Sequence, residues 1–269
     1  MGQLSGKSVV LTGASQGLGV VMARALATAG ADLLLAARSE DKLKAVALAM
    51  PPGSRVAVQV TDVTSVADRS TLLKRAHSEF GSIDVLINNA GVEDLGSYTE
   101  QDPAVLRRII ETNLLSPMLL AREALPAMLK RGQGHVVNIA SLAGRTGMPF
   151  GAAYSGSKGG LAEWSISLAA ELRDTGVAVS VICPGFVAET GMFSRKDAPA
   201  PRSIGASSPE AVAMAVLKIL RTRKVEVVVN PKPVRLLMAL KALSPEAALA
   251  VGRRLGLVDF LKRISAHKP

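Results

Sequence analysis

The chain has 269 residues, of which 48% are hydrophobic and 20% charged, and its formal net charge is +10. This length and composition predict a single large domain with a substantial buried core and exclude a disordered chain. The single cysteine excludes an internal disulfide framework. No stretch reaches the roughly 18 uninterrupted apolar residues of a membrane-spanning helix. No apolar run typical of a secretory leader follows the first residues, so we expect a cytoplasmic protein.

Much of the positive charge lies near the C-terminus. Residues 221–269 contain eleven Lys/Arg and three Asp/Glu. Basic tails of this kind contact nucleic acid, anionic lipid or acidic proteins. Phe260 is the only aromatic residue of this stretch, whereas proteins that bind single-stranded nucleic acid stack bases on several aromatic side chains. We therefore expect no nucleic-acid partner.

Short apolar runs alternate with longer helical patterns along most of the chain. The predicted strands are Ser8–Leu11, Asp32–Ala36, Arg55–Gln59, Val85–Asn88, His135–Ile139, Ala178–Cys183 and Glu226–Val229. The predicted helices are Gly17–Ala29, Ser39–Met50, Val66–Phe80, Pro103–Lys130, Ala153–Arg173 and Pro209–Arg221. Near-continuous apolar strands are typical of parallel strands covered on both faces. The sequence thus predicts an α/β fold with a doubly wound, seven-stranded parallel sheet of Rossmann type and helices on both faces.

Two features modify this pattern. Pro117 and Pro126 predict a kink or break in the helix over 103–130. Residues 231–269 predict a basic, apolar helical C-terminal extension, in which one helix begins at Ser244-Pro245-Glu246 and ends at Gly256. This extension could lie on an anionic membrane, fold over a pocket of the main domain, or pack on a neighbouring subunit.

A glycine-containing loop follows the first predicted strand. The segment Thr12-Gly13-Ala14-Ser15-Gln16-Gly17-Leu18-Gly19 leads from this strand into the first helix. Glycines let the backbone turn sharply and let phosphates approach the amides, and the helix start offers unpaired N–H groups. We therefore expect a nucleotide pyrophosphate to bind here. The residues expected to contact it are Gly13, Ser15, Gln16, Gly17, Leu18 and Gly19.

Tyr154 and Lys158 are one helical turn apart, and Ser141 lies thirteen residues before Tyr154. A phenol normally titrates near pKa ~10 and is a poor proton donor and acceptor at neutral pH. An ammonium at ~4 Å, at an effective dielectric of ~20, contributes roughly 4 kcal/mol, which would lower that pKa by about three units. Tyr154 could then exchange a proton with a substrate oxygen, and Ser141 could donate a hydrogen bond to that oxygen. Residues 1–230 are therefore expected to form a dinucleotide-binding and catalytic domain.

Further motifs occur in a recognisable order: Asn88-Asn89-Ala90-Gly91, Asn113 and Pro184-Gly185. With these, the chain resembles the classical short-chain dehydrogenase/reductases over about residues 7–229. The resemblance implies hydride transfer between a nicotinamide cofactor and a carbonyl or secondary alcohol, with Tyr154 as the acid/base. It also implies that Lys158 holds the nicotinamide ribose and that Asn113 positions a water linking Lys158 to solvent. The expected catalytic residues are Asn113, Ser141, Tyr154 and Lys158.

The same resemblance implies additional cofactor contacts. They are Asp62, Val63, Asn89, Ala90, Gly91, Tyr154, Lys158, Pro184, Gly185, Val187 and Thr190. Asp62 would face the adenine amino group, or could instead be a turn carboxylate. Asn88 is expected to tie strands together. Thr190 stands one residue later than in the relatives, which leaves its contact with the cofactor open.

Charge at the end of the second strand indicates which nicotinamide cofactor is used. An acidic residue there would bind the ribose 2′-hydroxyl of NAD, but this chain has Ala37 followed by Arg38. A guanidinium suits the 2′-phosphate of NADP, and Ser39 could add a hydroxyl. Gln16 is neutral where many NADP-using relatives carry Arg or Lys. We expect NADP(H) to be preferred over NAD(H).

The expected pocket mouth is mainly apolar. Its residues are Leu142, Ala143, Met148, Phe150, Phe186, Met192 and Phe193. The prediction is an NADPH-dependent oxidoreductase acting on a lipophilic steroid-, retinoid- or acyl-like substrate. The alternatives are a non-catalytic nucleotide-binding scaffold and a peripheral membrane-binding protein.

No residue spacing suggests a metal site. The resemblance implies a homodimer or homotetramer that pairs the helices predicted over 103–130 and 153–173.

Overall fold

The structure is a computed structural model that describes residues 2–188, 200 and 204–266. Its centre is a sheet of seven parallel strands. Their order is β3 (Val56–Val60), β2 (Asp32–Ala37), β1 (Ser8–Thr12), β4 (Val85–Asn88), β5 (Gly134–Ile139), β6 (Val177–Pro184) and β9 (Glu226–Val229). The order reverses between β1 and β4, which is where ligands bind in doubly wound sheets. The predicted strand bounds differ from these by at most one residue at either end.

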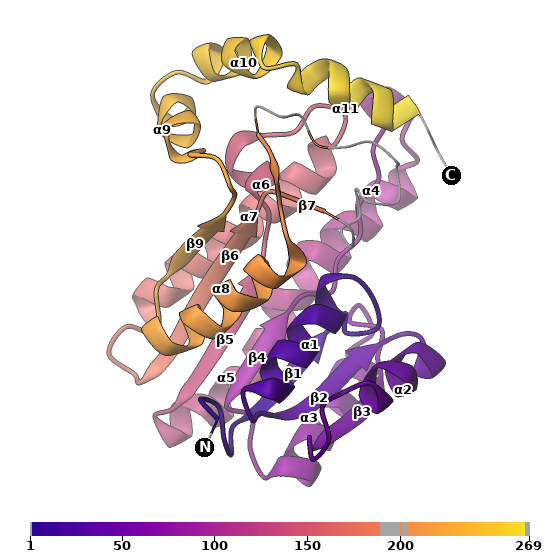
Figure 1. Cartoon of the computed structure of the whole chain (residues 1–269), viewed down its shortest axis with the longest axis vertical. Helices are drawn as coiled ribbons and strands as arrows, with labels where there is room; N and C mark the ends of the chain where they lie inside the picture. The colour runs from indigo at the N-terminus through magenta and orange to yellow at the C-terminus, as the bar shows by residue number, and fades with distance from the viewer. Residues whose placement is uncertain (1, 189–199, 201–203, 267–269) are drawn as a thin grey trace.

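Helices cover both faces of the sheet (Figure 1). One face carries α1 (Leu18–Thr28), α2 (Glu40–Leu48) and α8 (Pro209–Thr222). The other carries α3 (Val66–Phe80), α5 (Ser116–Arg131) and α7 (Ala152–Glu171). This arrangement confirms the doubly wound Rossmann-type fold that the sequence predicts.

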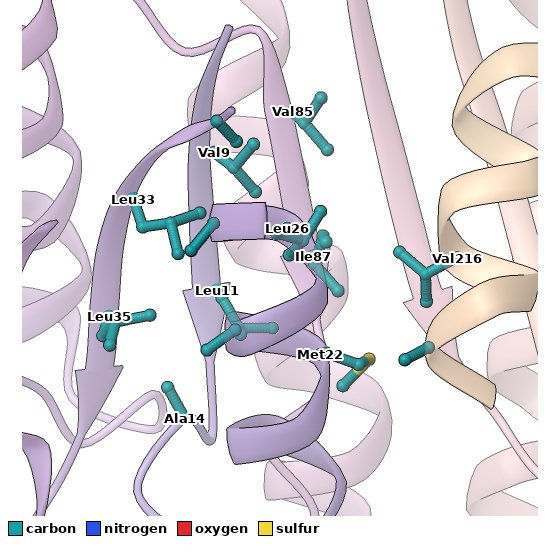
Figure 2. Packing of buried hydrophobic residues seen from close by; sticks show 14 of the residues in the cluster. Val9, Leu11, Ala14, Met22, Leu26, Leu33, Leu35, Val85, Ile87 and Val216 are labelled. Carbon is teal, nitrogen blue, oxygen red and sulfur yellow. The ribbon is translucent and has the colours of Figure 1, made fainter. Parts of the chain in front are cut away.

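Most strand residues are apolar because the side chains of each strand point alternately into the cores on the two faces of the sheet. In β1, Val9 and Leu11 point to the α1 face, whereas Val10 points to the α3 and α5 face. Figure 2 shows the first of these cores, in which Met22 of α1 and Val216 of α8 lie over the strand side chains. A sheet buried on both faces fixes the strand ends, and with them the loops that follow.

The helix predicted over 103–130 is divided, but the break precedes Pro117. α4 (Pro103–Ile110) is followed by a π-helical turn, η2 (Glu111–Leu115), and then by α5. Proline has no N–H, so Pro117 cannot donate the usual helical hydrogen bond to the carbonyl of Asn113. A single π-turn accommodates this loss of a donor. α5 continues through Pro126, so of the kink or break predicted there, the helix is not broken at that proline.

Several short elements were not predicted. They are η1 (Tyr98–Glu100), α6 (Leu142–Thr146) and the paired two-residue strands β7 (Phe186–Val187) and β8 (Ala206–Ser207). The predicted site residues Thr190, Met192 and Phe193 lie outside the described residues.

The C-terminal extension forms α9 (Arg235–Leu243), α10 (Pro245–Arg254) and α11 (Leu257–Ala266). In Figure 1 these helices form an arch at the end of the molecule opposite the N-terminus. Ser244 caps α10, because its hydroxyl accepts a hydrogen bond from the Ala247 amide at 3.2 Å. α9 is tied to the main domain by Lys241, whose ammonium donates to the carbonyl of Arg145 at 2.9 Å. In the part of the chain that the structure describes, no helix is long and apolar enough to cross a membrane.

Candidate active site

The glycine loop after β1 leaves no room for side chains at two of its positions. A Cβ atom on Gly13 would lie 2.8 Å from the Cα of Ala90, and one on Gly19 would lie 2.1 Å from the carbonyl oxygen of Gly13. Gly17 has a φ of 58°, a left-handed conformation that favours glycine. The loop therefore packs backbone against backbone, directly beside the Asn89-Ala90-Gly91 segment that follows β4.

The start of α1 is suited to an anion. Its first turn has no side-chain cap and no acidic residue. The Val20 amide donates to the Gly17 carbonyl at 3.2 Å, and the amides of Leu18 and Gly19 before it are those placed to bind a ligand. Gln16, next to this helix start, is exposed. The predicted phosphate-binding segment from Gly13 to Gly19 thus has the shape and polarity that a pyrophosphate requires.

Thr12 holds the ends of β1 and β4 together, a role that the sequence analysis missed. Its hydroxyl accepts hydrogen bonds from the amides of Asn89 at 3.0 Å and Ala90 at 3.1 Å. The Asn89 side chain in turn donates to the carbonyls of Thr12 at 3.0 Å and Gly13 at 3.1 Å. The Asn89 side chain therefore positions the glycine loop. In the sequence, the feature that indicates this contact is Thr12, which directly precedes the first glycine of the motif.

Asn88 behaves as expected. Its side-chain amide donates to the side-chain oxygen of Asn138 at 2.8 Å, which joins β4 to β5 within the buried core.

Arg38 and Asp62 lie near each other at the ends of β2 and β3. Arg38 is exposed, and Ser39 begins α2 without using its hydroxyl as a cap. The Asp62 carboxylate accepts hydrogen bonds from the amide and the hydroxyl of Thr64 at 2.9 and 2.7 Å, which is the turn arrangement considered as an alternative. Partial burial opposes the charge of Asp62, but the Thr64 hydrogen bonds and the charge of Arg38 leave its pKa below the ordinary value. A cation and a hydroxyl at this edge fit a ribose phosphate.

Ser141, Tyr154 and Lys158 come together at the carboxyl end of β5. Ser141 is the N-cap of α6, where its hydroxyl accepts from the amide of Ala143 at 3.2 Å, and it is hydrogen-bonded to the Tyr154 side chain. Lys158 lies one turn further along α7 and donates to the carbonyl of Ile139 at 2.8 Å. Tyr154 is 5% exposed and Lys158 is 4% exposed. A phenol and an amine thus lie buried beside the nucleotide-binding loop.

The protonation of this pair differs from the expectation. Burial raises the pKa of Tyr154 well above its ordinary value, the charge of Glu93 raises it further, and the hydrogen bond with Ser141 lowers it. Burial lowers the pKa of Lys158 to about 8. Lys158 is not among the groups that shift the pKa of Tyr154, so the acidification expected from its charge is not found in this structure. Glu93, two residues after the Asn-Ala-Gly segment, was not predicted as a site residue and has no distinguishing sequence motif.

Asn113 is fully buried, and its side chain connects the loop after β4 to α7 by hydrogen bonds. Its side-chain oxygen accepts from the amide of Val92 at 2.8 Å, and its side-chain nitrogen donates to the Val92 carbonyl at 2.7 Å and to the Ser157 hydroxyl at 3.1 Å. The Ser157 hydroxyl donates to the carbonyl of Tyr154 at 2.7 Å. The side chain of Asn113 is thus occupied in joining the loop after β4 to α7.

Gly91 lies beside the side chains of both Asn113 and Lys158. A Cβ atom on Gly91 would lie 3.3 Å from the side-chain oxygen of Asn113 and 3.4 Å from the ammonium of Lys158. A Cβ atom at this position would make a tight contact with Asn113 and an ordinary van der Waals contact with Lys158, so the backbone of the loop lies close to both side chains.

The other predicted cofactor contacts lie at the ends of β3 and β6. Val63 is buried after β3. Pro184 ends β6, and the amide of Gly185 donates to the carbonyl of Val229 at 2.9 Å. Val187 is buried in the short strand β7. These residues flank the same edge of the sheet as Tyr154.

The C-terminal helix α11 supplies part of the wall around Tyr154. Phe260, Leu261 and Ile264 form one buried cluster with Tyr154, Leu95 and Met148, against which Phe186 and Phe150 pack. The rings of Phe186 and Phe260 meet edge to face, with centroids 5.6 Å apart. Of the arrangements considered for the extension, α11 therefore packs on the main domain around Tyr154. No sequence motif around Phe260 indicates this contact.

The start of α1, which is suited to an anion, and the buried Tyr154 and Lys158 lie at the same carboxyl edge of a doubly wound sheet. This combination defines a nucleotide-dependent oxidoreductase of the Rossmann class. Comparison with known families is more specific: the chain belongs to the short chain dehydrogenase family, whose model matches residues 7–200.

Individual relatives extend this comparison. The chain is 42% identical to a protein named ketoacyl reductase HetN from Nostoc sp., over all of this chain and 96% of that protein. It is 34% identical to dehydrogenase/reductase SDR family member 7B of Bos taurus, over 88% of this chain and 77% of that protein. Among solved structures, a variant of actinorhodin polyketide ketoreductase with NADPH superposes with a TM-score of 0.76 at 29% identity. That match covers 83% of this chain and 95% of the ketoreductase. The relatives agree with an oxidoreductase that interconverts C=O and CH–OH.

Proposed function

We propose that this enzyme uses NADPH to reduce the ketone of a lipophilic acyl-type substrate to a secondary alcohol. The observation that carries the proposal is the hydrogen bond between the half-buried Ser141 and the buried Tyr154, beside an apolar cluster and the glycine loop. The names of the relatives support it, because the protein that matches the whole chain is called a ketoacyl reductase. Met148, Phe186 and Phe260 in the wall suit an alkyl chain better than a polar substrate.

The residues present fit a dinucleotide. The Gly13–Gly19 segment and the start of α1 would hold the pyrophosphate, and Arg38 with Ser39 would hold a 2′-phosphate. Lys158, beside Gly91, would hold the ribose next to the nicotinamide. When bound, the reduced cofactor would supply the hydride.

The protein itself would supply position and a proton. Ser141 would donate a hydrogen bond to the ketone oxygen and steady its developing negative charge. Tyr154 would give its phenolic proton to the same oxygen, since its high pKa keeps it protonated at neutral pH. The positive charge of Lys158 would favour the tyrosinate left behind. Asn113 and Ser157 would keep α7, and therefore Tyr154, in register with the loop after β4.

Replacing Tyr154 with Phe tests this assignment. Loss of the proton donor is expected to lower kcat by about 100- to 10,000-fold while NADPH binding, followed by its fluorescence, is retained. Tyr98, the only other tyrosine, is 63% exposed and provides the matched control, Tyr98→Phe. Undiminished turnover in a folded Tyr154→Phe protein would refute the mechanism.

A substrate panel tests the proposed substrate class. We would follow NADPH and NADH oxidation with 3-ketoacyl thioesters of increasing chain length, a steroid ketone, retinal and a small aliphatic ketone. The proposal expects kcat/KM to rise with acyl chain length and to be higher with NADPH than with NADH. Preference for the steroid or retinal would replace the acyl assignment. NADPH binding without turnover of any carbonyl would favour a nucleotide-binding scaffold.

We also propose self-association through the helices that contain Asn113 and Tyr154. Ile110, Leu115 and Leu129 on this side of the molecule are 40%, 45% and 39% exposed, which is high for large apolar residues. Replacing Leu115 with Asp is expected to shift the mass measured by light scattering from dimer or tetramer to monomer. A monomeric unaltered protein would exclude this interface.

A further inference from the structure

The outer surfaces of α9 and α10 carry exposed leucines. Leu236 and Leu243 of α9 are 78% and 87% exposed, and Leu249 of α10 is 60% exposed. Leu255, which follows α10, is 40% exposed. α11 differs, because its apolar side chains are buried against Tyr154 and its neighbours. The apolar surface of the extension that remains uncovered therefore belongs to α9 and α10.

These leucines occupy defined helix faces. Leu236 and Leu243 are seven residues apart, which is two helical turns, and the exposed Ala239 lies between them. α9 packs against α10 and α6 and contains no fully buried residue. α10 turns Ala248 inward and Leu249 outward. α9 thus has an apolar side facing solvent, whereas the solvent side of α10 carries Leu249 together with Glu246 and two arginines.

Basic residues surround this apolar surface. Lys232 and Arg235 are exposed at the start of α9, and Arg253 and Arg254 are exposed at the end of α10. Lys262 adds an exposed ammonium on α11. The acidic residues in the sequence from 231 to 269 are Glu246 and Asp259, against eight Lys/Arg. The charge of the extension is therefore strongly positive where its leucines are exposed.

We propose that the α9–α10 surface docks peripherally on an anionic lipid bilayer. Leucines flanked by Lys and Arg match a membrane interface, where acyl chains accept the leucines and anionic headgroups attract the cations. The surface is composed of aliphatic residues and small alanines, without the aromatic anchors that dominate tight protein interfaces. This charge complementarity favours a lipid surface over a second copy of the chain, whose own extension would be equally positive.

The docking surface adjoins the proposed substrate site without being part of it. α10 leads directly into α11, whose Phe260 and Leu261 contact the cluster around Tyr154. A bilayer held against α9 and α10 would lie near the wall of this pocket. The docking proposal does not depend on the enzyme reducing an acyl substrate.

Vesicle co-sedimentation with the full chain tests the proposal. The probes are vesicles of phosphatidylcholine alone and of phosphatidylcholine with phosphatidylglycerol, each at low and high salt. We expect binding to the anionic vesicles that weakens as salt screens the headgroup charge. The double change Arg253→Gln and Arg254→Gln should lower the partition coefficient about 25-fold, since each basic residue near an anionic surface contributes about fivefold. The double change Leu236→Ser and Leu243→Ser should lower it about tenfold.

Matched controls are available elsewhere on the surface. Leu48, at the end of α2, has the same 87% exposure as Leu243, so Leu48→Ser removes an equally exposed leucine. Arg24→Gln with Lys130→Gln removes the same charge from exposed positions of α1 and α5. Both controls should bind vesicles as the unaltered protein does. Circular dichroism and the turnover of a water-soluble ketone report whether each variant is folded and whether the site still works.

Three outcomes would overturn the proposal. The first is absence of binding to anionic vesicles by the unaltered chain. The second is equal loss of binding in the control and α9–α10 variants, which would indicate nonspecific charge attraction. The third is a mass, measured by light scattering without lipid, that falls when Leu236 and Leu243 are replaced, which would assign this surface to self-association instead.

Discussion

Truncation of Phe260 to alanine would separate the contribution of α11 to stability from its contribution to the pocket. Phe260 is 5% exposed, and its ring meets Phe186 edge to face. Removing a buried phenyl group typically lowers the free energy of unfolding by about 3–5 kcal/mol. Edge-to-face pairing accounts for about 0.5–1.5 kcal/mol of this, so a cycle with Phe186→Leu should show a coupling of that size.

Two measurements distinguish local from global effects. Chemical denaturation followed by circular dichroism gives the free energy of unfolding, and hydrogen exchange over residues 257–266 shows whether α11 detaches alone. In the same variant, kcat/KM should fall for a long-chain ketoacyl thioester more than for a small ketone, because only the longer chain reaches this wall. Phe80→Ala is the control, since Phe80 packs under Arg55 far from Tyr154 and should lower stability without changing chain-length preference. Loss of less than about 1 kcal/mol, with unchanged hydrogen exchange in α11, would refute the packing described for Phe260.

Three further changes test the electrostatics of the fold. Arg38→Ala should raise KM for NADPH about 10- to 100-fold, because a charged hydrogen bond to the 2′-phosphate, contributing about 1.5–3 kcal/mol, is lost. KM for NADH, which has no 2′-phosphate, should stay unchanged. An equal effect on both cofactors would contradict the role of Arg38. Glu93→Gln should move the alkaline limb of the reduction rate to lower pH, since removing a negative charge lowers the pKa of Tyr154, and Asp94→Asn is the neighbouring control. Burial, together with the charge of Arg223, lowers the pKa of His135 to about 4. As the pH drops, the unfolded chain therefore binds a proton at this histidine before the folded protein does. The free energy of unfolding consequently falls between about pH 6.5 and about pH 4. His135→Gln should remove about 3 kcal/mol of this pH dependence in denaturation curves, and an unchanged pH dependence would show that other groups cause it.

Much of the fold could be predicted because the apolar runs that mark the strands are local in the sequence and recur along the chain. Each strand is a short run of apolar residues, and burial on both faces makes that run continuous, as in Leu33-Leu34-Leu35-Ala36. The glycine loop could be predicted for a related reason, since Gly13 and Gly19 occupy positions where a Cβ atom has no space. In both cases the local sequence reflects a constraint that any chain with this fold must meet.

The site was harder to predict where its properties depend on burial or on distant contacts. The Tyr154–Lys158 spacing gave their proximity correctly, but the pKa of Tyr154 depends on how far the phenol is removed from water, which spacing does not specify. The ring of His135 lies 2.8 Å from the Ser180 hydroxyl on the neighbouring strand, a contact between residues 45 positions apart that the sequence around His135 does not indicate. Phe260 joins the pocket from more than one hundred residues away, and no pattern around it indicates that contact. Such properties arise only when the chain has folded.

The tight packing of the glycine loop has a consequence for ligand binding. Gly13 rests against Ala90, the Asn89 side chain grips the loop from β4, and the Ala14 amide donates to the Ala36 carbonyl at 3.1 Å. The site proposed for the pyrophosphate is therefore already formed, and a nucleotide that binds there would have to order little of the chain. Affinity at this end of the site should reflect mainly the hydrogen bonds that the phosphate oxygens accept. Amides at the start of α1 should gain protection from exchange when the nucleotide binds, whereas the Ala14 amide, which already has a backbone partner, should not change.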